Sequence, residues 1–211
     1  MTTPVSLPAA ELSLGEQLQD LIRQLPDDGI SLGGLLDVFG DEGLLLLTAM
    51  MVLVFLVPVS IPGVSTVFGA AILMVGVSRL TGRALWLPRR LRERTLPGSR
   101  VRAALAGGLK WVRRFERISR PHRLRQLAEQ GGWLIVGNLA FISAALLLMA
   151  PLSLLPFSNT LPALALLFYS IGFIQRDGGA VLVGHVAQAT SIAYFGAVLA
   201  GGGAALAALF A

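Results

Sequence analysis

The sequence predicts an all-α integral membrane protein, in which two proline-broken helical hairpins form an internal repeat and a final transmembrane helix follows them. Three observations predict this class. The chain of 211 residues is 55% hydrophobic and 14% charged, whereas charged residues make up about a quarter of an ordinary soluble domain. Residues 43–78, 133–174 and 180–211 contain no Asp, Glu, Lys or Arg. All but two of the 17 Lys and Arg residues lie between Arg79 and Arg125, and such a basic segment is retained on the cytoplasmic side of a membrane.

Residues 1–42 form an acidic N-terminal arm, in which Arg23 is the one basic residue. Leucines at helical spacing predict a short amphipathic helix over residues 11–25, ended by Pro26. Ser31 is placed to cap a second helix from residue 32 to 39, before Gly40. We expect both helices to lie outside the hydrocarbon of the membrane.

Residues 43–78 predict the first membrane hairpin, because this apolar segment is longer than the roughly 20 residues that one span needs. Pro58, Pro62 and Gly63 interrupt it midway. Two arrangements fit equally well: a re-entrant hairpin that dips into the membrane and returns, or two tilted full spans joined by a tight turn. Irregular backbone at membrane depth must be buried in protein or face a wet cavity. The break is therefore either a periplasmic turn or part of a site.

Residues 79–130 predict a basic interfacial segment on the cytoplasmic side. Trp86, Arg89 and Arg90 combine an aromatic ring with positive charge, as residues at the membrane surface do. An apolar stripe over residues 105–118 lies apart from Arg113, Arg114 and Arg117, which predicts either a helix on the membrane surface or a solvated face packed on the protein. The flanking apolar segments make the lipid bilayer and anionic head groups the expected partners, and they argue against nucleic acid.

Residues 131–175 predict a second broken hairpin that repeats the first. A shift of 98 residues superposes Pro58 on Pro156 and Ser60 on Ser158, which indicates an internal duplication. Interrupted apolar segments at matching positions of two halves are typical of transporter-like sites.

Residues 176–211 predict a C-terminal transmembrane helix. Small residues recur at every fourth position, as at Gly196 and Ala200, and such stripes let helices approach closely. The partner helix belongs either to the same chain or to a second copy, and we favour a homodimer. For His185, inside this helix, we expect a neutral packed side chain with a backbone or side-chain partner rather than a proton relay.

Polar residues at the breaks and charged residues at the hairpin ends are the candidate substrate-binding residues. They are Ser60, Pro62, Gly63, Ser158, Asn159, Pro162, Arg79, Arg176 and Asp177. Structural roles compete with binding: short polar side chains cap free backbone groups, and arginines at a membrane boundary serve as snorkelling anchors. The sequence has no Ser-His-Asp order, no phosphate loop, no Cys and two isolated His. We therefore expect no catalytic residue, no metal, no cofactor and no enzymatic activity.

Several short motifs are spread over residues 30–190. They include Leu-Gly-Gly-Leu-Leu at 32–36, Pro-Gly-Val-Ser-Thr at 62–66, Trp-Leu-Pro at 86–88, Phe-Ser-Asn at 157–159 and Arg-Asp-Gly at 176–178. Their order and spacing resemble the ExoD family of bacterial inner-membrane proteins. The resemblance implies a multi-pass protein of the inner (cytoplasmic) membrane with a role in exopolysaccharide synthesis, and it carries no agreed activity or catalytic residue to this chain. The paired broken helices also look like the re-entrant hairpins of DedA-type lipid transporters, an analogy of architecture.

Two functional hypotheses follow. In the first, the protein is a non-enzymatic carrier or handler of a lipid or lipid-linked saccharide, which binds at the paired breaks while Arg79, Arg176 and Asp177 guide its head group. In the second, the protein is a membrane scaffold or regulator that recruits polysaccharide-synthesis enzymes through its charged cytoplasmic segments. The first predicts sensitivity at the breaks, and the second predicts sensitivity to charge reversal in the basic segment.

Overall fold

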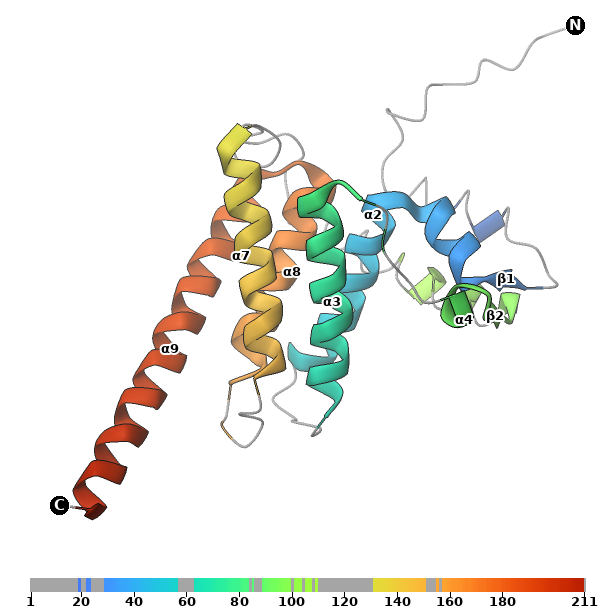
Figure 1. The fold of residues 1–211 in the computed structure, drawn as a ribbon. Helices are drawn as coiled ribbons and strands as arrows, with labels where there is room; N and C mark the ends of the chain where they lie inside the picture. Colours follow the sequence, from blue (N-terminus) through green and yellow to red (C-terminus); the bar gives the residue numbers. More distant parts are fainter. Residues whose placement is uncertain are drawn as a thin grey trace, which may run out of the picture. The chain divides into compact units, whose positions relative to one another are not determined.

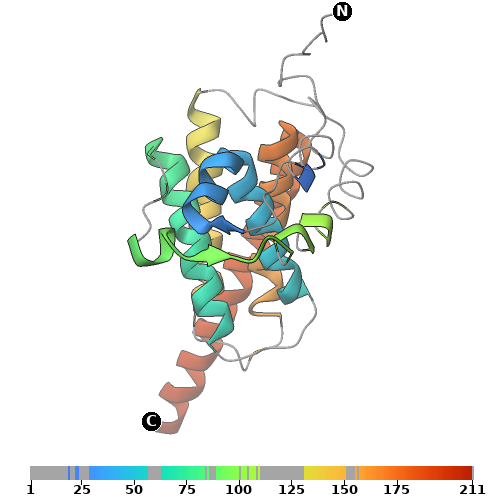
Figure 2. The same cartoon turned by 90° about the vertical axis from the view of Figure 1, so that its right-hand side faces the viewer.

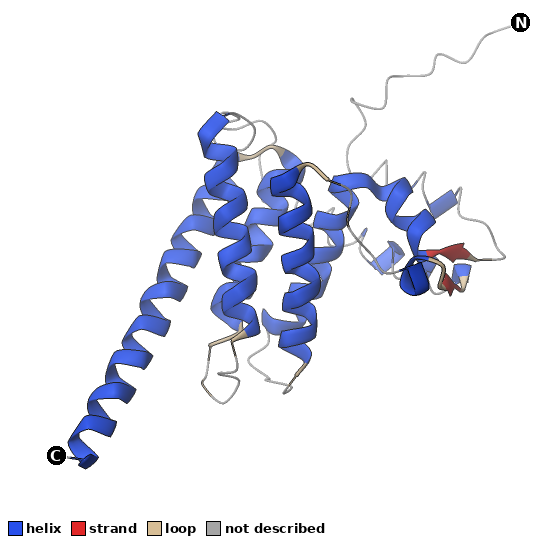
Figure 3. Ribbon diagram, viewed as in Figure 1, coloured by secondary structure: helices blue, strands red, loops and turns tan. Residues whose placement is uncertain are grey.

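The computed structural model describes residues 29–56, 63–83, 89–99, 101–103, 105–107, 131–150 and 157–210, together with single positions such as Arg23, Leu109 and Leu155. Within these residues the chain is mostly helical, as predicted (Figure 1, Figure 3). The elements are β1 (Ile30–Ser31), α2 (Leu32–Leu53), the short 3-10 helix η1 (Val54–Leu56), α3 (Val64–Thr81), α4 (Arg89–Arg92), β2 (Thr95–Leu96), α7 (Gly131–Met149), α8 (Thr160–Gln175) and α9 (Gly178–Phe210).

Among the described residues, three helices are long and apolar enough to cross a membrane. They are α3, α7 and the part of α9 from Gly178 to Gly201, whereas α8 is a shorter apolar helix. The predicted class of helical membrane protein is therefore confirmed. The predicted amphipathic helix over residues 11–25 and most of the predicted surface helix over residues 105–118 lie outside the described residues.

The chain divides into two compact units, one made of residues 1–40 and 87–120 and the other of residues 41–86 and 121–211. In the first unit β1 pairs antiparallel with β2, and Ile30 lies opposite Leu96; the sequence did not predict this pair. The Gly34 N–H donates to Ser31 Oγ over 3.0 Å, which confirms the predicted cap of α2. Gly40 ends the first part of α2 with a left-handed φ of 56°, as its position after the predicted helix suggests.

The second unit is a bundle in which α8 lies at the centre. Ten of the 16 residues of α8 are buried, and α8 contacts α7, α9 and η1. The second half of α2 and α7 run toward one end of the bundle, and α3 and α8 return from it (Figure 1, Figure 2). The helices therefore end and begin where the sequence predicted the two breaks. The break residues 57–62, with Ser60 and Pro62, lie outside the described residues.

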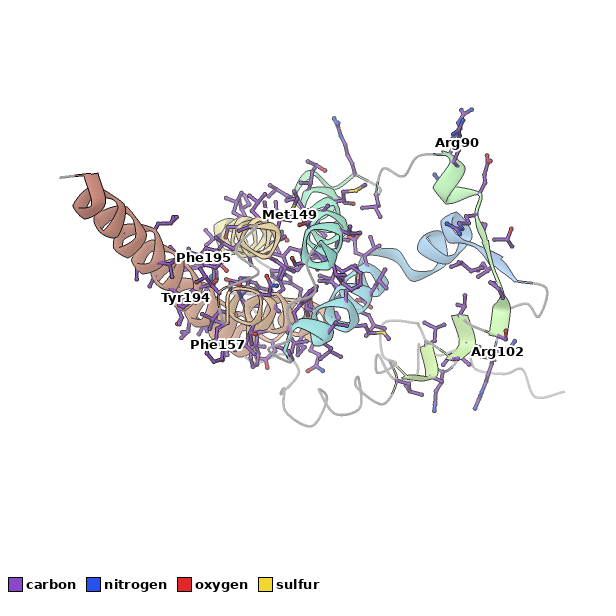
Figure 4. The ribbon with its side chains drawn as sticks, turned by 90° about the horizontal axis from the view of Figure 1, so that it is seen from below. Arg90, Arg102, Met149, Phe157, Tyr194 and Phe195 are labelled. Atoms are coloured by element: carbon purple, nitrogen blue, oxygen red, sulfur yellow. The ribbon has the colours of Figure 1, made fainter. Side chains whose placement is uncertain are left out.

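Glycines set the close approach of the bundle helices. A Cβ on Gly76 of α3 would lie 2.8 Å from Ile142 Cγ1 of α7, and a Cβ on Gly69 would meet the Met149 side chain. Figure 4 shows Met149 between α7 and α3. On the other side of the bundle, a Cβ on Gly184 of α9 would lie 2.8 Å from the Tyr169 ring of α8. Larger residues at these positions would push the helices apart.

Where its side chains are described, the predicted stripe of small residues on α9 is exposed. Gly196 and Ala200 are exposed, and among the described residues no atom lies within 4 Å of a Cβ built on Gly196. The helix α9 packs on α8 through Gly184 instead. Packing of the stripe against a second copy stays a prediction.

Candidate functional site

The candidate residues fall at two opposite ends of the bundle. Ser158 and Asn159 precede α8, and Arg176 and Asp177 follow it, so the two pairs are separated by about 24 Å at 1.5 Å per helical residue. Arg79 lies in the last turn of α3, at the end of the bundle where α8 also ends (Figure 1). The structure thus brings Arg79, Arg176 and Asp177 to one end, and it does not bring them to the breaks.

At the break end, Ser158 has a capping contact. Its hydroxyl donates to the Leu155 carbonyl over 2.9 Å. Gly63 has a left-handed φ of 84° and precedes α3. Pro162 is fully buried in the first turn of α8, where the missing N–H of proline is tolerated.

Asn159 differs from its neighbours, because it caps α8 without a side-chain hydrogen bond. Its side chain is 6% exposed, and neither of its amide atoms has a partner.

At the opposite end, the Arg79 side chain is directed toward α8. Its guanidinium carbon lies 4.9 Å from the centroid of the Phe173 ring, a cation–π geometry. Its Nε is buried and has no hydrogen-bond partner among the described residues. The negative charges of Asp41 and Glu42, on α2, act on this guanidinium. A snorkelling anchor would extend away from the bundle to the head groups, whereas Arg79 contacts a buried ring.

Phe173 continues into a series of ring contacts that reaches α9. The Tyr169 ring stacks on Phe173 with centroids 6.1 Å apart, and the Tyr169 hydroxyl lies 2.9 Å from His185 Nδ1. We call Arg79, Phe173, Tyr169 and His185 the Arg79–His185 series. The prediction that His185 is packed against a side-chain partner is confirmed. Three helices, α3, α8 and α9, are therefore connected by one series of polar and aromatic side chains.

Arg176 and Asp177 form the tight connection between α8 and α9. Arg176 ends α8 with a left-handed φ of 54°, and the Asp177 N–H donates to the Gly172 carbonyl over 2.9 Å. The buried Asp177 carboxylate accepts from the Gly179 N–H over 2.8 Å, so it caps the start of α9. The geometry gives Asp177 a structural contact beside the candidate site.

The membrane-surface candidates lie mostly outside the described residues. Trp86, Arg113, Arg114 and Arg117 belong to this group. Arg89 and Arg90 are described, and both are exposed on α4.

Sequence analysis missed a set of neutral polar groups inside the bundle. Gln188 Nε2 on α9 donates to Ser143 Oγ on α7 over 2.8 Å. Further buried atoms have no hydrogen-bond partner in the part of the chain that the structure describes: Asn138 Oδ1, Ser170 Oγ, Gln175 Oε1, Gln188 Oε1 and Ser191 Oγ. Each of these side chains lies in a segment without charged residues, so hydropathy does not reveal it. Polar groups in apolar membrane segments are costly and concentrate at functional sites, and this rule is the signal that could have found them.

Long apolar helices with polar groups buried among them define a helical membrane protein. The family to which the chain belongs within this class follows from its sequence. The chain belongs to the ExoD family, because the family model described as "Exopolysaccharide synthesis, ExoD" matches residues 14–197.

Two curated relatives are similar over most of the chain. Protein ExoD of Rhizobium meliloti (strain 1021) is 41% identical over 186 residues, which cover 88% of this chain and 77% of that protein. The uncharacterized protein slr1875 of Synechocystis sp. is 28% identical over 167 residues, which cover 78% of this chain and 77% of that protein. No solved structure matches the chain.

Proposed function

We propose that this member of the ExoD family is a multi-pass inner-membrane protein that binds the head group of a lipid or lipid-linked saccharide at the Arg79 end of the bundle. It handles the lipid during exopolysaccharide synthesis without catalysing a reaction, and it uses no cofactor. The observation that carries the proposal is the half-buried Arg79 side chain, whose guanidinium lies over Phe173 while its buried Nε has no hydrogen-bond partner among the described residues.

The position of Arg79 carries an energetic cost. A charged side chain inside a membrane is expensive and is retained where function needs it. A buried donor without a partner costs about 1–3 kcal/mol more. A ligand that accepts from Nε would remove this penalty on binding. Because Arg79 lies in the last turn of α3, the ligand group would sit at the depth of lipid head groups.

The lengths of α3 and α7 support full spans rather than re-entrant hairpins, whereas the 16 residues of α8 extend over about 24 Å. At 1.5 Å per residue, the 18 residues of α3 and the 19 residues of α7 extend over about 27 and 29 Å, which is close to a hydrocarbon core of about 30 Å. The two hairpins run in the same sense (Figure 1), which supports a repeat related by an axis along the membrane normal. The positive charge of the basic segment favours an orientation with the Arg79 end on the cytoplasmic side and both breaks on the periplasmic side.

An Arg79→Gln variant tests the proposal, with Arg83→Gln as its matched control. Arg83 follows α3 at the same end of the bundle, and its side chain is exposed. We expect Arg79→Gln to lower exopolysaccharide output while the membrane fraction retains the folded protein, and Arg83→Gln to leave both unchanged. Equal polymer output from Arg79→Gln and the native chain would refute the proposal.

A structural role for Arg79 would give a different result. If Arg79→Gln fails to accumulate in the membrane, Arg79→Lys supplies the second measurement, because it keeps the charge and removes Nε. Normal output from a folded Arg79→Lys protein would show that the Nε donor is not needed.

The scaffold hypothesis is supported by a separate observation on the first unit. Arg89, Arg90 and Arg94 are exposed, and the Arg90 side chain extends away from α4 (Figure 4). Such a surface suits anionic lipid head groups or an acidic partner. Replacing Arg89 and Arg90 with Glu would abolish a scaffold's recruitment, whereas a head-group site at Arg79 would tolerate the change.

A further inference from the structure

The amide oxygen of Asn138 is another buried polar atom of the bundle without a hydrogen-bond partner among the described residues. Asn138 lies on α7 and is 4% exposed, and no described residue forms a hydrogen bond with its Oδ1. A buried acceptor of this kind inside an apolar segment loses its bonds to water and gains nothing in return.

The packing of α3 on α7 brings Asn138 and Arg79 to one level. Gly76 of α3 contacts Phe141 of α7, since a Cβ on Gly76 would lie 3.0 Å from Phe141 Cδ1. The two helices are antiparallel (Figure 1). One turn farther toward the same end, Arg79 follows Gly76 by three residues and Asn138 precedes Phe141 by three. The two side chains therefore share one level of the α3–α7 interface.

The Phe173 ring of α8 lies at the same level of the bundle. The Arg79 guanidinium carbon lies 4.9 Å from its centroid. A Cβ on Gly137, the neighbour of Asn138, would lie 3.1 Å from Phe173 Cζ, and the Phe141 ring centroid lies 6.4 Å from that of Phe173. Arg79 and Gly137 thus approach one ring from two helices, and Asn138 follows Gly137 by one residue on α7.

The chemistry of the two unpaired atoms defines the group that would fit between them. Arg79 Nε–H can only donate a hydrogen bond, and Asn138 Oδ1 can only accept one. A hydroxyl accepts through its oxygen and donates through its hydrogen, so a single hydroxyl satisfies both atoms. An ionised phosphate oxygen only accepts, and it would leave Asn138 unpaired. The charges of Asp41 and Glu42 that act on Arg79 would also repel an anion.

We propose that Arg79 and Asn138 together bind a hydroxyl of a saccharide head group, so that the ligand of this site is a glycosylated lipid rather than a lipid recognised by its bare phosphate. This inference rests on the proposed function and specifies its substrate class. Arg79 supplies the donor, Asn138 supplies the acceptor, and Phe173 holds the guanidinium in place.

The test measures lipid binding to the full chain in phosphatidylcholine nanodiscs. The two probes are a short-chain glucosyl diacylglycerol and a phosphatidic acid with the same acyl chains. Asn138→Leu removes the acceptor at similar volume. Ser191→Ala is the control, because it also deletes a buried unpaired oxygen but lies on α9, roughly 12 Å deeper in the bundle.

We expect the native chain to bind the glucosyl lipid more tightly than the phosphatidic acid. Asn138→Leu should weaken the binding of the glucosyl lipid about tenfold, which corresponds to about 1.4 kcal/mol, and should leave the binding of phosphatidic acid unchanged. Ser191→Ala should bind both lipids as the native chain does. If Asn138→Leu does not fold, Asn138→Ala removes the same acceptor with a smaller side chain and should show the same selective loss.

Two results would overturn the inference and leave the proposed function standing. One is native affinity of Asn138→Leu for the glucosyl lipid while Arg79→Gln loses it, which would mean that the acceptor holds a structural water only. The other is tighter binding of phosphatidic acid than of the glucosyl lipid. Failure of the native chain to bind either lipid would instead refute the proposed function itself.

Discussion

Replacing Gly76 with Ala tests whether α3 and α7 are held together by close backbone approach. A Cβ at this position would lie 2.8 Å from Ile142 Cγ1 and 3.0 Å from Phe141 Cδ1. Phe141 is fully buried, so its ring has little room to move aside. Overpacking of this kind destabilises a protein by about 1–3 kcal/mol. The higher helix propensity of Ala relative to Gly stabilises the helix by about 1 kcal/mol and offsets part of that loss. We therefore expect a net loss of up to about 2 kcal/mol in the free energy of unfolding.

Gly196→Ala on α9 is the matched control, because the chemical change is the same. Gly196 is exposed, and among the described residues nothing lies within 4 Å of its added Cβ, so at a protein concentration that keeps the chain monomeric we expect a gain of up to about 1 kcal/mol. The difference between the two variants isolates the packing cost of about 1–3 kcal/mol. Titration of the full chain with SDS in mixed micelles, followed by helical circular dichroism, measures both values. Equal stability of the two variants would refute the close approach of α3 and α7.

Three further predictions address the kink, the Arg79–His185 series and the topology. Gly40→Ala should lower the free energy of unfolding by about 1–3 kcal/mol, because Gly40 has φ 56° and ψ −157°; an unchanged midpoint in SDS would contradict the kink. Tyr169→Phe should lower the free energy of unfolding by about 0.6–2 kcal/mol, because the contact with His185 is lost. A double-mutant cycle with His185→Phe should show coupling between the two residues; additive losses would contradict this interaction. In a chain without native cysteine, an impermeant thiol reagent should label Phe157→Cys from the periplasm and Arg83→Cys only after permeabilisation. Protection of Phe157→Cys from both sides would favour re-entrant hairpins.

The secondary structure was largely predictable, because it depends on local properties of the chain. Apolar segments long enough for the membrane predicted α3, α7 and α9, and prolines and glycines predicted where the hairpins break. The cap at Ser31 followed from residue type and position, and the structure contains it. The pairing of β1 with β2 was not predictable, since each strand has two residues and no periodicity can develop over that length.

The site was only partly predictable. Charge drew attention to Arg79, and the partner at His185 was anticipated in kind but not identified as Tyr169. Residues at the breaks and at the hairpin ends were grouped in one site, whereas the length of α8 separates Asn159 from Arg176. Asn138 was not singled out at all, because one neutral polar residue hardly changes the hydropathy of a span.

By itself the sequence determined that this chain is a helical membrane protein, which residues can enter the bilayer, and its membership of the ExoD family. These properties depend on composition, hydropathy and the order of short motifs, and all three are local. Only the tertiary structure decided which polar groups meet. Arg79 and Asn138 are 59 positions apart in the sequence, and they share one level because Gly69 and Gly76 let α3 pack closely on α7 in a particular register. Register depends on which side chains interdigitate across an interface, and that information is not contained in either helix alone.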